Sequence, residues 1–563
     1  MRKRKLFTFL GFMILLFTGC NDSSLVDNST VEGLSNSLAS TGLTSADFLK
    51  TNGTFIKKNS GTGSNVFLRG TNAGGWLVQE SWMNPTNASD QKTMMSTFTS
   101  RFGTSGRDEL IDVYEDNFWT TADFDNCANM GMTVIRLPFT YMNLVTDDNS
   151  AIKAGGWDRL DWFVENCRSR GMYVILDLHG AFGSQNGMDH SGEVNDGKQL
   201  WWNDDNKGKT KWLWWQIANH FKGNPAVAAY DILNEPGIKA AATYSLQWDF
   251  YDQIYDVIRG VDADHIIIME SCWDAANLPR PSVYGWTNVV YEYHYYPWNY
   301  VSNYSGQVSY VDSKVSNINN AGYGVPTFVG EFTCFGLADA WKYTLNAYNN
   351  QGWHWTSWAY KATGSNTSWG IYNHTPSTVD IYNDSKATIK SKWATVGASS
   401  TWKNTTVYNA MVTGLKQTST ATIANGAYYF KGVNTGKIVC ADNSGANPLI
   451  ANRSSYGGAW ETLNIVNNSD GTVSLKSGAN NLYVCMVNDE NKQLLARSST
   501  IGTWEKFYLV KVTNTQFALK SYVNNLYVTV NQNNSNILYA TANTIEAWEV
   551  FNVYTTGGAQ ITN

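Results

Sequence analysis

The chain has 563 residues, of which 43% are hydrophobic and 16% are charged. This length exceeds one ordinary domain, and the apolar content exceeds that of a disordered chain, so at least two folded domains are expected. A formal net charge of −6 leaves no basic face for phosphate, and nucleic acid is not expected as a partner. Aromatic residues make up 14% of the chain, which is typical of proteins that stack sugar faces on indole rings, although a large aromatic core would also produce it.

The N-terminal residues predict an export signal. Residues 2–5 are basic, residues 6–17 are mostly apolar, and Thr18-Gly19 precede Cys20. We expect 1–19 to be a lipoprotein signal peptide that is removed before Cys20, whose thiol then carries lipid. The alternative is a plain secretory signal. The protein is therefore expected to be exported and lipid-anchored to a bacterial cell envelope membrane, at the outer membrane or cell surface. Its only membrane contact would be this anchor, since no later stretch approaches the roughly 18 apolar residues of a membrane span.

Residues 20–48 are rich in Ser, Asn and Thr without apolar periodicity, which predicts a flexible tether. The cysteines after Cys20 lack CxxC spacing, so buried free thiols are favoured over a bridge such as Cys127 to Cys167. The seven histidines form no HExxH pattern and no close His/Asp cluster. Neither a metal site nor another cofactor is expected.

Residues 49–397 alternate apolar β-rich runs with helical patterns, which predicts an α/β fold. Eight strands are expected, at 66–70, 133–137, 173–177, 229–233, 265–269, 289–293, 326–330 and 355–359. Between them, apolar residues such as Leu160, Phe163, Val164 and Cys167 share one helical face. Eight strand–helix units predict a (β/α)₈ TIM barrel. A doubly wound sheet would instead need a Gly-rich phosphate turn, and residues 70–75 open no nucleotide-binding helix.

Residues 425–563 contain an internal repeat. Trp-Glu dipeptides recur every 44 residues, at Trp460, Trp504 and Trp548. Three copies of this turn-rich unit predict an all-β domain, which resembles a β-trefoil of the fascin-like or ricin-like kind; a propeller would need at least about four blades. We expect each repeated Trp to be buried and infer carbohydrate binding only from the attachment to an enzyme-like body. Residues 398–424 are the expected linker.

Two glutamates stand where a barrel carries its chemistry, at the C-terminal ends of strands. Glu235 lies in Asp231-Ile-Leu-Asn-Glu-Pro236 after the fourth strand, and Glu331 lies in Val329-Gly-Glu-Phe332 at the end of the seventh. Hydrolysis of an acetal needs one carboxyl to protonate the leaving oxygen and a second to support the oxocarbenium-like centre. A separation of about 5–5.5 Å lets the second carboxylate attack directly, with retention of configuration.

These residues resemble those of glycoside hydrolase family 5, and the resemblance covers roughly residues 50–395. Arg136 on the second strand, His179 after the third, His294-Tyr-Tyr296 after the sixth and Trp358 on the eighth fall on the family's pattern. Within the family, residues 69–77 and 176–187 look most like exo-β-1,3-glucanases of the fungal type. That likeness implies that Glu80 and Asp189 hold hydroxyls at a terminal glucose subsite. Ala73 and Phe182 depart from it, which leaves linkage and exo or endo mode open.

The roles of the other residues follow from charge and hydrogen bonding. Arg136 is expected to keep Glu331 ionised, Tyr296 to orient the same carboxylate, and Asn234 to bind the sugar's 2-hydroxyl. Glu235 should have a raised pKa, from partial burial and the nearby charge of Glu331. His179 and His294 are assigned to the site by their positions at strand ends. The candidate sugar platforms in predicted loops are Trp82, Trp201, Trp202, Trp273 and Trp298.

The sequence therefore predicts a retaining O-glycosyl hydrolase that acts on a polysaccharide or oligosaccharide with β-linked glucose, most readily β-1,3-glucan. β-1,6-Glucan, β-1,4-glucan and β-mannan remain alternatives, because loop conformations set subsite shape. A Ser hydrolase would need a Gly-x-Ser-x-Gly elbow, which the barrel region lacks. A non-catalytic glycan-binding lipoprotein is the rival from another class, and the presence of both glutamates argues against it.

Overall fold

The computed structural model describes residues 42–562, apart from 196, 238–243, 272–273, 365–368, 398–401, 417–420, 422, 469–471, 488–491, 514, 525 and 543–544. The predicted signal peptide, Cys20 and the tether up to residue 41 lie outside the described residues. Residues 42–48, assigned to the tether from the sequence, form the 3-10 turn η1 (Ser45–Asp47) and bury Leu43 and Phe48. A small antiparallel sheet follows, made of β1 (Lys50–Asn52), β2 (Phe55–Lys57) and β3 (Asn65–Val66), with α1 (Lys58–Gly61) after β2.

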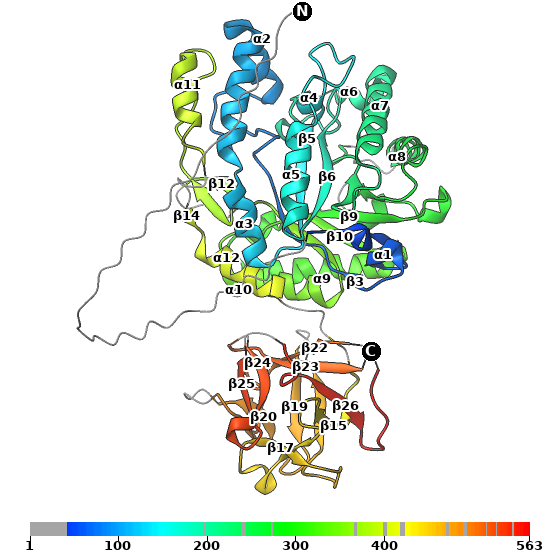
Figure 1. Ribbon diagram of the computed structural model, residues 1–563, viewed down its shortest axis with the longest axis vertical. Helices are drawn as coiled ribbons and strands as arrows, with labels where there is room; N and C mark the ends of the chain where they lie inside the picture. The colour runs from blue at the N-terminus through cyan, green and yellow to red at the C-terminus, as the bar shows by residue number, and fades with distance from the viewer. Residues whose placement is uncertain are drawn as a thin grey trace, which may run out of the picture. The chain divides into compact units, whose positions relative to one another are not determined.

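Eight parallel strands close into a barrel in the order of the chain, which confirms the predicted barrel. They are β4 (Arg69–Asn72), β5 (Val134–Thr140), β6 (Tyr173–Gly180), β7 (Val227–Asp231), β8 (Ile266–Glu270), β9 (Val289–Tyr295), β10 (Thr327–Phe332) and β11 (His354–Ser357). Almost every strand residue is buried, because the helices cover the outer face of the barrel (Figure 1).

The helices of this region are α2 (Gln91–Phe118), α3 (Thr121–Met130), α4 (Tyr141–Leu144), α5 (Asp158–Ser169), α6 (Gln199–Trp202), α7 (Asp204–Phe221), α8 (Tyr244–Arg259), α9 (Tyr304–Ala321), α10 (Ala338–Asn350) and α11 (Lys386–Trp393). In α5 the buried side chains are the four that the helical period selected, Leu160, Phe163, Val164 and Cys167. Cys127 and Cys167 are both buried free thiols, as expected, as are Cys334, Cys440 and Cys485. Cys272 lies outside the described residues.

The described part of the expected linker is folded. The strands β12 (Lys361–Thr363), β13 (Tyr372–His374) and β14 (Trp402–Lys403) form a small sheet, and α12 (Thr405–Lys416) lies beside α10 (Figure 1). Val407 and Met411 of α12 are buried in the same apolar core as the barrel. The Asn349 side-chain amide donates to the Gly414 carbonyl at 2.9 Å. Residues 405–416 are thus a packed helix, as their apolar sequence allows.

The C-terminal domain is mostly β sheet, as expected. Its strands are β15 (Gly426–Gly432), β16 (Ile438–Ala441), β17 (Leu449–Arg453), β18 (Leu463–Asn467), β19 (Val473–Ser477), β20 (Tyr483–Met486), β21 (Leu494–Ser498), β22 (Phe507–Lys511), β23 (Gln516–Ser521), β24 (Tyr527–Asn531), β25 (Ile537–Ala542) and β26 (Phe551–Thr555). They enclose an apolar core of their own.

The repeated Trp-Glu pairs of this domain are structural, but not in the way expected. Trp460 is 38% exposed, and Trp504 and Trp548 are half-buried, so the prediction of a buried Trp in each unit is wrong. The buried member is the glutamate. The carboxylates of Glu461, Glu505 and Glu549 accept backbone N–H groups of the preceding turn, from Gly457, Gly502 and Glu546 respectively. Each glutamate therefore closes its own turn, which explains why the residue recurs with the repeat.

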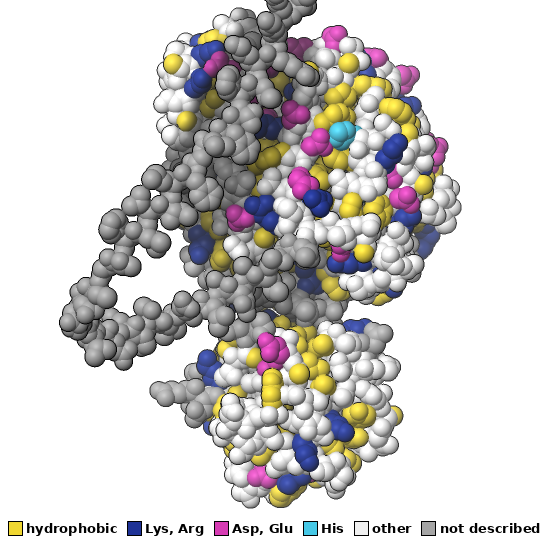
Figure 2. All heavy atoms as spheres, in the orientation of Figure 1, with side chains coloured by type: hydrophobic (Ala, Val, Ile, Leu, Met, Phe, Trp, Pro, Cys, Tyr) yellow, Lys and Arg dark blue, Asp and Glu magenta, His cyan; other side chains and the backbone are white. Residues whose placement is uncertain are grey.

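Among the helices of the described residues, none has an apolar stretch long enough to cross a bilayer. On the face drawn in Figure 2, acidic and basic side chains are interspersed.

Candidate active site

The two predicted catalytic glutamates meet at the mouth of the barrel. Glu235 follows β7 and Glu331 lies on β10, and both side chains are largely buried, with exposed fractions of 13% and 6%. A carboxylate oxygen of each, together with a ring nitrogen of His294, lies within 4.8 Å of the others. The strand assignment from the sequence therefore placed both residues correctly.

Two features of β10 aim Glu331 into the mouth. The register between β10 and β9 shifts between Val329 and Glu331, and such a bulge re-aims the side chain that follows. Gly330 is needed beside it, because a Cβ there would meet an oxygen of Glu292 at 1.5 Å. The carboxylate is then held from both sides: Arg136 donates to Oε1 at 3.0 Å and the Tyr296 hydroxyl donates to Oε2 at 2.7 Å. Both contacts were expected.

Glu235 is held in a strained backbone conformation. Its φ is +40°, and Pro236 follows it, which further restricts its backbone. The buried Glu270 carboxylate accepts the Glu235 N–H at 2.6 Å and anchors this turn. The side chain faces two imidazoles: His294 Nδ1 is 3.0 Å from Oε1, and His190 Nε2 is 3.0 Å from Oε2. The contact with His294 fits the assignment of that residue to the site.

Arg136 organises the floor of the site. Its guanidinium is fully buried and donates to Asp231 at 2.8 Å, to the Asn72 side chain at 3.1 Å and to Asn234 Oδ1 at 2.9 Å. Asp177 and Glu292 lie 3.1 and 3.3 Å from it. The Asn234 amide nitrogen is buried and has no hydrogen-bond partner among the described residues. It is therefore available for a substrate hydroxyl.

The pKa of Glu235 differs from the expectation. Burial opposes the charge on this carboxyl, but hydrogen bonds from His190 and His294 outweigh burial and hold its pKa well below its usual range. Burial also opposes the charge on His190, yet the hydrogen bond to Glu235 raises its pKa to about 9. The predicted rise in the pKa of Glu235 is therefore wrong while both imidazoles are charged. The expectation of a raised pKa included the charge of Glu331 but not the two imidazolium groups.

Above these acids lies a cavity of about 490 Å³. Its lining residues are Glu80, Trp82, His179, Met188, His190, Asn234, Glu235, Tyr296, Trp298, Glu331, Trp358 and Trp369. Trp358 is 4% exposed and its ring stacks on His179 at 5.5 Å, so it forms a wall. Trp298 is 61% exposed and contacts Trp369 at 5.4 Å. One side of the mouth is thus aromatic, as suits an apolar sugar face.

Glu80 and Asp189 lie together beside His190. One oxygen of each and a nitrogen of His190 are within 4.8 Å of one another. Glu80 lines the cavity and accepts the Trp82 indole N–H at 2.8 Å, while its second oxygen is buried without a partner among the described residues. Burial raises the pKa of Glu80 to about 7. Asp189 is 36% exposed at its side chain and stands beside the cavity.

Several residues of the site were missed or misjudged from sequence. His190 and Trp369 were not selected; the signal for His190 was its place next to Asp189, whereas Trp369 gave none. Trp201 is wrong as a sugar platform, because it is 2% exposed and donates to the Gln185 carbonyl. Trp202 is 65% exposed. Trp273 lies outside the described residues.

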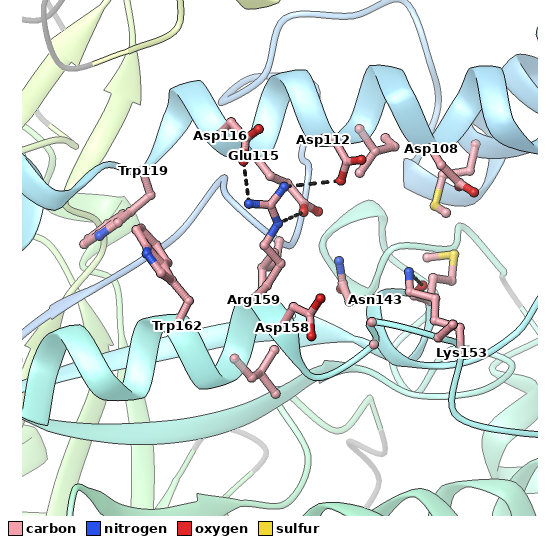
Figure 3. A pocket seen from close by; sticks show the side chains of 18 of the residues that line it. Asp108, Asp112, Glu115, Asp116, Trp119, Asn143, Lys153, Asp158, Arg159 and Trp162 are labelled. Carbon is pink, nitrogen blue, oxygen red and sulfur yellow. Dashed lines mark hydrogen bonds and ion pairs between the residues drawn. The ribbon is translucent and has the colours of Figure 1, made fainter. Parts of the chain in front are cut away.

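A larger hollow, about 730 Å³, lies outside the barrel between α2 and α5 (Figure 3). Four of its charged groups are paired with one another: Arg159 contacts Asp112, Glu115 and Asp116 at 3.2, 2.9 and 2.5 Å. These ion pairs join α5 to α2 and therefore have a structural role. We place the chemistry at the barrel mouth and not in this hollow.

Three sets of described side chains could hold a metal ion: Glu80 with Asp189 and His190, Glu235 with His294 and Glu331, and Glu270 with Glu292 and His294. All three belong to the site just described or to its floor. In the second set, a cation would occupy the carboxylates that hydrolysis requires.

A barrel with paired carboxylates at its mouth defines the class of O-glycosyl hydrolases, and comparison with known proteins agrees. Residues 76–364 match the sequence profile described as cellulase, glycosyl hydrolase family 5. The chain belongs to glycosyl hydrolase family 5 and is an O-glycosyl hydrolase.

Proteins named for different activities are similar to the chain. A beta-xylosidase of Phanerodontia chrysosporium is 28% identical over 346 residues, which cover 56% of this chain and 71% of that protein. The "Probable glucan 1,3-beta-glucosidase A" of Neosartorya fischeri is 32% identical over 209 residues, or 36% of this chain and half of that protein. The crystal structure of rutinosidase from Aspergillus niger is 18% identical, covers 54% of this chain and 92% of that one, and has a TM-score of 0.43.

Proposed function

We propose that this chain is a retaining β-glycosidase in which Glu331 is the nucleophile and Glu235 the acid/base. The observation that supports this most is the close approach of their carboxylate oxygens, within 4.8 Å. Retaining enzymes hold the two groups about 5–5.5 Å apart, whereas inverting enzymes leave about 6.5–9.5 Å for a water molecule.

The surroundings divide the roles between the two acids. Glu331 touches a guanidinium and a tyrosine hydroxyl, which orient it and balance its charge while it attacks the anomeric carbon. Glu235 faces two imidazoles at 3.0 Å, which can donate hydrogen bonds to its carboxylate once it has given its proton to the leaving oxygen. Asn234 offers an unpaired amide N–H for the sugar's 2-hydroxyl, whose hydrogen bond strengthens in the transition state.

We propose β-linked glucan as the substrate, with β-1,3-glucan first. The glucan 1,3-beta-glucosidase among the relatives supports this choice, as do the neighbouring acids Glu80 and Asp189, which can bind the hydroxyls of a terminal sugar. A β-xyloside is the second candidate, because the beta-xylosidase matches over more of the chain.

The test is sugar release from laminarin, β-1,6-glucan, carboxymethylcellulose, mannan and xylo-oligosaccharides, with Glu331→Gln as the inactive control. Glucose from laminarin, released with the β configuration first, would support the proposal. Xylose from xylo-oligosaccharides would support the second candidate. An α-configured first product, or equal activity in the variant, would contradict the mechanism.

We also propose that the chain is exported and that lipid on Cys20 anchors it to a bacterial envelope membrane. The arrangement of charged, apolar and small residues before Cys20 supports this. Incorporation of labelled palmitate into the wild type and not into Cys20→Ala is the expected result.

For residues 425–563 we propose a β-trefoil arrangement that binds carbohydrate, supported by the three 44-residue repeats. A different strand topology in this domain, or no retention of the protein on insoluble glucan, would contradict the proposal.

A further inference from the structure

We propose that the first of the three repeats in the C-terminal domain holds a sugar-binding site formed by Asp442, Arg453 and Trp460, which takes a glucosyl unit of a β-linked glucan. The inference rests on the carbohydrate binding proposed for residues 425–563 and assigns it to one place in that domain. The glutamate of each Trp-Glu pair closes its turn in all three repeats, whereas the Asp and the Arg beside Trp460 are not repeated.

The three repeats have equivalent backbones where the Trp-Glu turn meets a strand. In each repeat a strand N–H donates to the carbonyl of the Trp, at 2.8, 3.0 and 3.1 Å; the pairs are Ala441 and Trp460, Met486 and Trp504, and Val530 and Trp548. The residue after each donor is therefore equivalent in the three repeats, and these residues are Asp442, Val487 and Asn531. Of the three, only Asp442 carries a charge.

The strand pairs define a second set of equivalent positions. In each repeat the register shifts after one residue pair, and these pairs are Ile438 with Arg453, Tyr483 with Ser498, and Tyr527 with Ala542. Arg453 is therefore equivalent to Ser498 and Ala542, which are uncharged. Since an Asp and an Arg occupy these two positions in the first repeat alone, the fold that the repeats share does not require them.

The two charged residues lie beside the exposed ring of Trp460. The guanidinium carbon of Arg453 is 5.7 Å from the centroid of the Trp460 ring, and its Nη2 donates to Asp442 Oδ1 at 3.3 Å. The Asn447 amide donates to the other oxygen of Asp442 at 2.9 Å and orients the carboxylate. Trp460 is 38% exposed, and the side chains of Arg453 and Asp442 are 35% and 31% exposed. The ring, the cation and the carboxylate therefore form one patch that solvent reaches.

The polar groups of this patch keep hydrogen-bonding capacity for a ligand. Charge-assisted N–H···O bonds are usually about 2.7–2.9 Å long. Arg453 is farther from its partners, at 3.3 Å from Asp442 and 3.5 Å from Glu461. A guanidinium has five N–H donors and a carboxylate accepts about four hydrogen bonds, so these contacts leave donors on Arg453 and acceptor sites on Asp442.

A neutral sugar fits this combination of groups. A β-glucosyl unit has C–H groups on its faces and hydroxyls around its edge. The indole of Trp460 can pack on the face, while Asp442 accepts from one hydroxyl and Arg453 donates to another. An anionic ligand fits less well, because the single guanidinium already faces two carboxylates, those of Asp442 and Glu461.

Binding at this patch would keep the enzyme on its polymer between cleavage events. A second contact on the same chain raises the effective concentration of the polymer at the barrel mouth without any new contact in the catalytic cavity. The patch would therefore matter for long glucans and not for short oligosaccharides, which cannot engage both places at once.

The experiment is affinity electrophoresis of the full chain in gels that contain laminarin, with Glu331→Gln in every protein so that the polymer is not cut. Trp460→Ala and Asp442→Ala should each raise the dissociation constant at least about fivefold. Asp442→Asn should weaken binding in the same direction, because it gives the first repeat the side chain that the third has at Asn531. Thermal unfolding of each protein shows whether a loss of binding is a loss of the site or of the fold.

The matched control is Asn531→Ala, at the equivalent position of the third repeat, which should bind laminarin as the Glu331→Gln protein does. The cavity of the barrel contributes the same residual binding to every protein. Unchanged binding in Trp460→Ala and Asp442→Ala, or an equal loss in Asn531→Ala, overturns the inference and leaves the proposed hydrolysis intact. If the Glu331→Gln protein itself is not retarded by laminarin, the carbohydrate binding proposed for residues 425–563 fails together with the inference.

Discussion

Arg136→Met should be the most disruptive single change at the floor of the barrel. The guanidinium is fully buried and lies within 3.3 Å of Asp177, Asp231, Glu292 and Glu331. Removing one partner of a buried ion pair costs about 3–5 kcal/mol, since the other charge remains in a medium of low dielectric constant. For a domain of this size that free energy corresponds to a drop in Tm of roughly 5–10 °C.

The loss of stability in Arg136→Met should increase as pH rises. Without Arg136 the buried carboxylates hold protons in the folded state that the unfolded chain releases, so their folded pKa values lie above the unfolded ones. Stability is then retained below pH 4 or so and lost as pH rises. The gap in Tm between Arg136→Met and the wild type should therefore be small near pH 4.5 and largest near pH 8. Activity should fall by roughly 10²-fold or more, because Glu331 loses its cation.

Calorimetric unfolding at pH 4.5, 6 and 8 would measure this. The matched control is Arg159→Met in the hollow of Figure 3, which removes a side chain that pairs with three acids but is 29% exposed. Two of its three partners, Asp112 and Asp116, are more than 60% exposed, and solvent-exposed pairs contribute about 0–1 kcal/mol each, so the loss of stability should be smaller and activity should be unchanged. Equal losses in the two variants, or a gap for Arg136→Met that does not change with pH, would refute the reasoning.

Three other changes have defined outcomes. Burial raises the pKa of Glu80 to about 7, so this carboxyl lowers the stability of the wild type as pH rises from about 4.5 to 7. Glu80→Gln should remove this contribution. The unfolding free energy of the variant, relative to that of the wild type, should therefore increase by about 3 kcal/mol between pH 4.5 and 8. A constant difference would contradict it. Met411→Ala should cost about 2–5 kcal/mol in urea unfolding of the barrel, because its side chain is fully buried; a cost near zero would mean that α12 is dispensable. Glu505→Ala should cost about 1–3 kcal/mol in the C-terminal domain through loss of its bond to Gly502, while the exposed Glu546→Ala should cost little, and the reverse order would exclude the turn-closing role.

The geometry also explains why both glutamates need so many supporting groups. Six buried acids, Asp177, Asp231, Glu235, Glu270, Glu292 and Glu331, share the floor and mouth of the barrel with Arg136 and His294. Burial raises the pKa of Asp177, Asp231 and Glu270 well above their usual range. Burial therefore opposes a negative charge on each of these three carboxyls, and the Arg136 guanidinium, 3.0 Å from Glu331, balances the charge of that carboxylate.

The sequence by itself determined the barrel, the two glutamates and the contacts of Arg136 and Tyr296. It could do so because strand and helix periods are local, and because in a closed parallel barrel every strand delivers its C-terminal residue to the same rim. Once eight strands are counted, Glu235 and Glu331 must face one mouth. Within the expected linker, residues 407–415 have a helical-looking sequence, but nothing in it showed that the helix formed by residues 405–416 packs against the barrel.

Only the tertiary structure decided the protonation of Glu235, the place of His190 and Trp369 in the cavity, and the burial of Glu505 in place of its neighbouring Trp. These depend on loops whose conformation no local period encodes, and on distances between side chains that are far apart in the sequence. The pKa of Glu235 is the clearest case. Its sign follows from two imidazoles at 3.0 Å, one from the loop after β6 and one from β9, and those distances exist only when the barrel has closed.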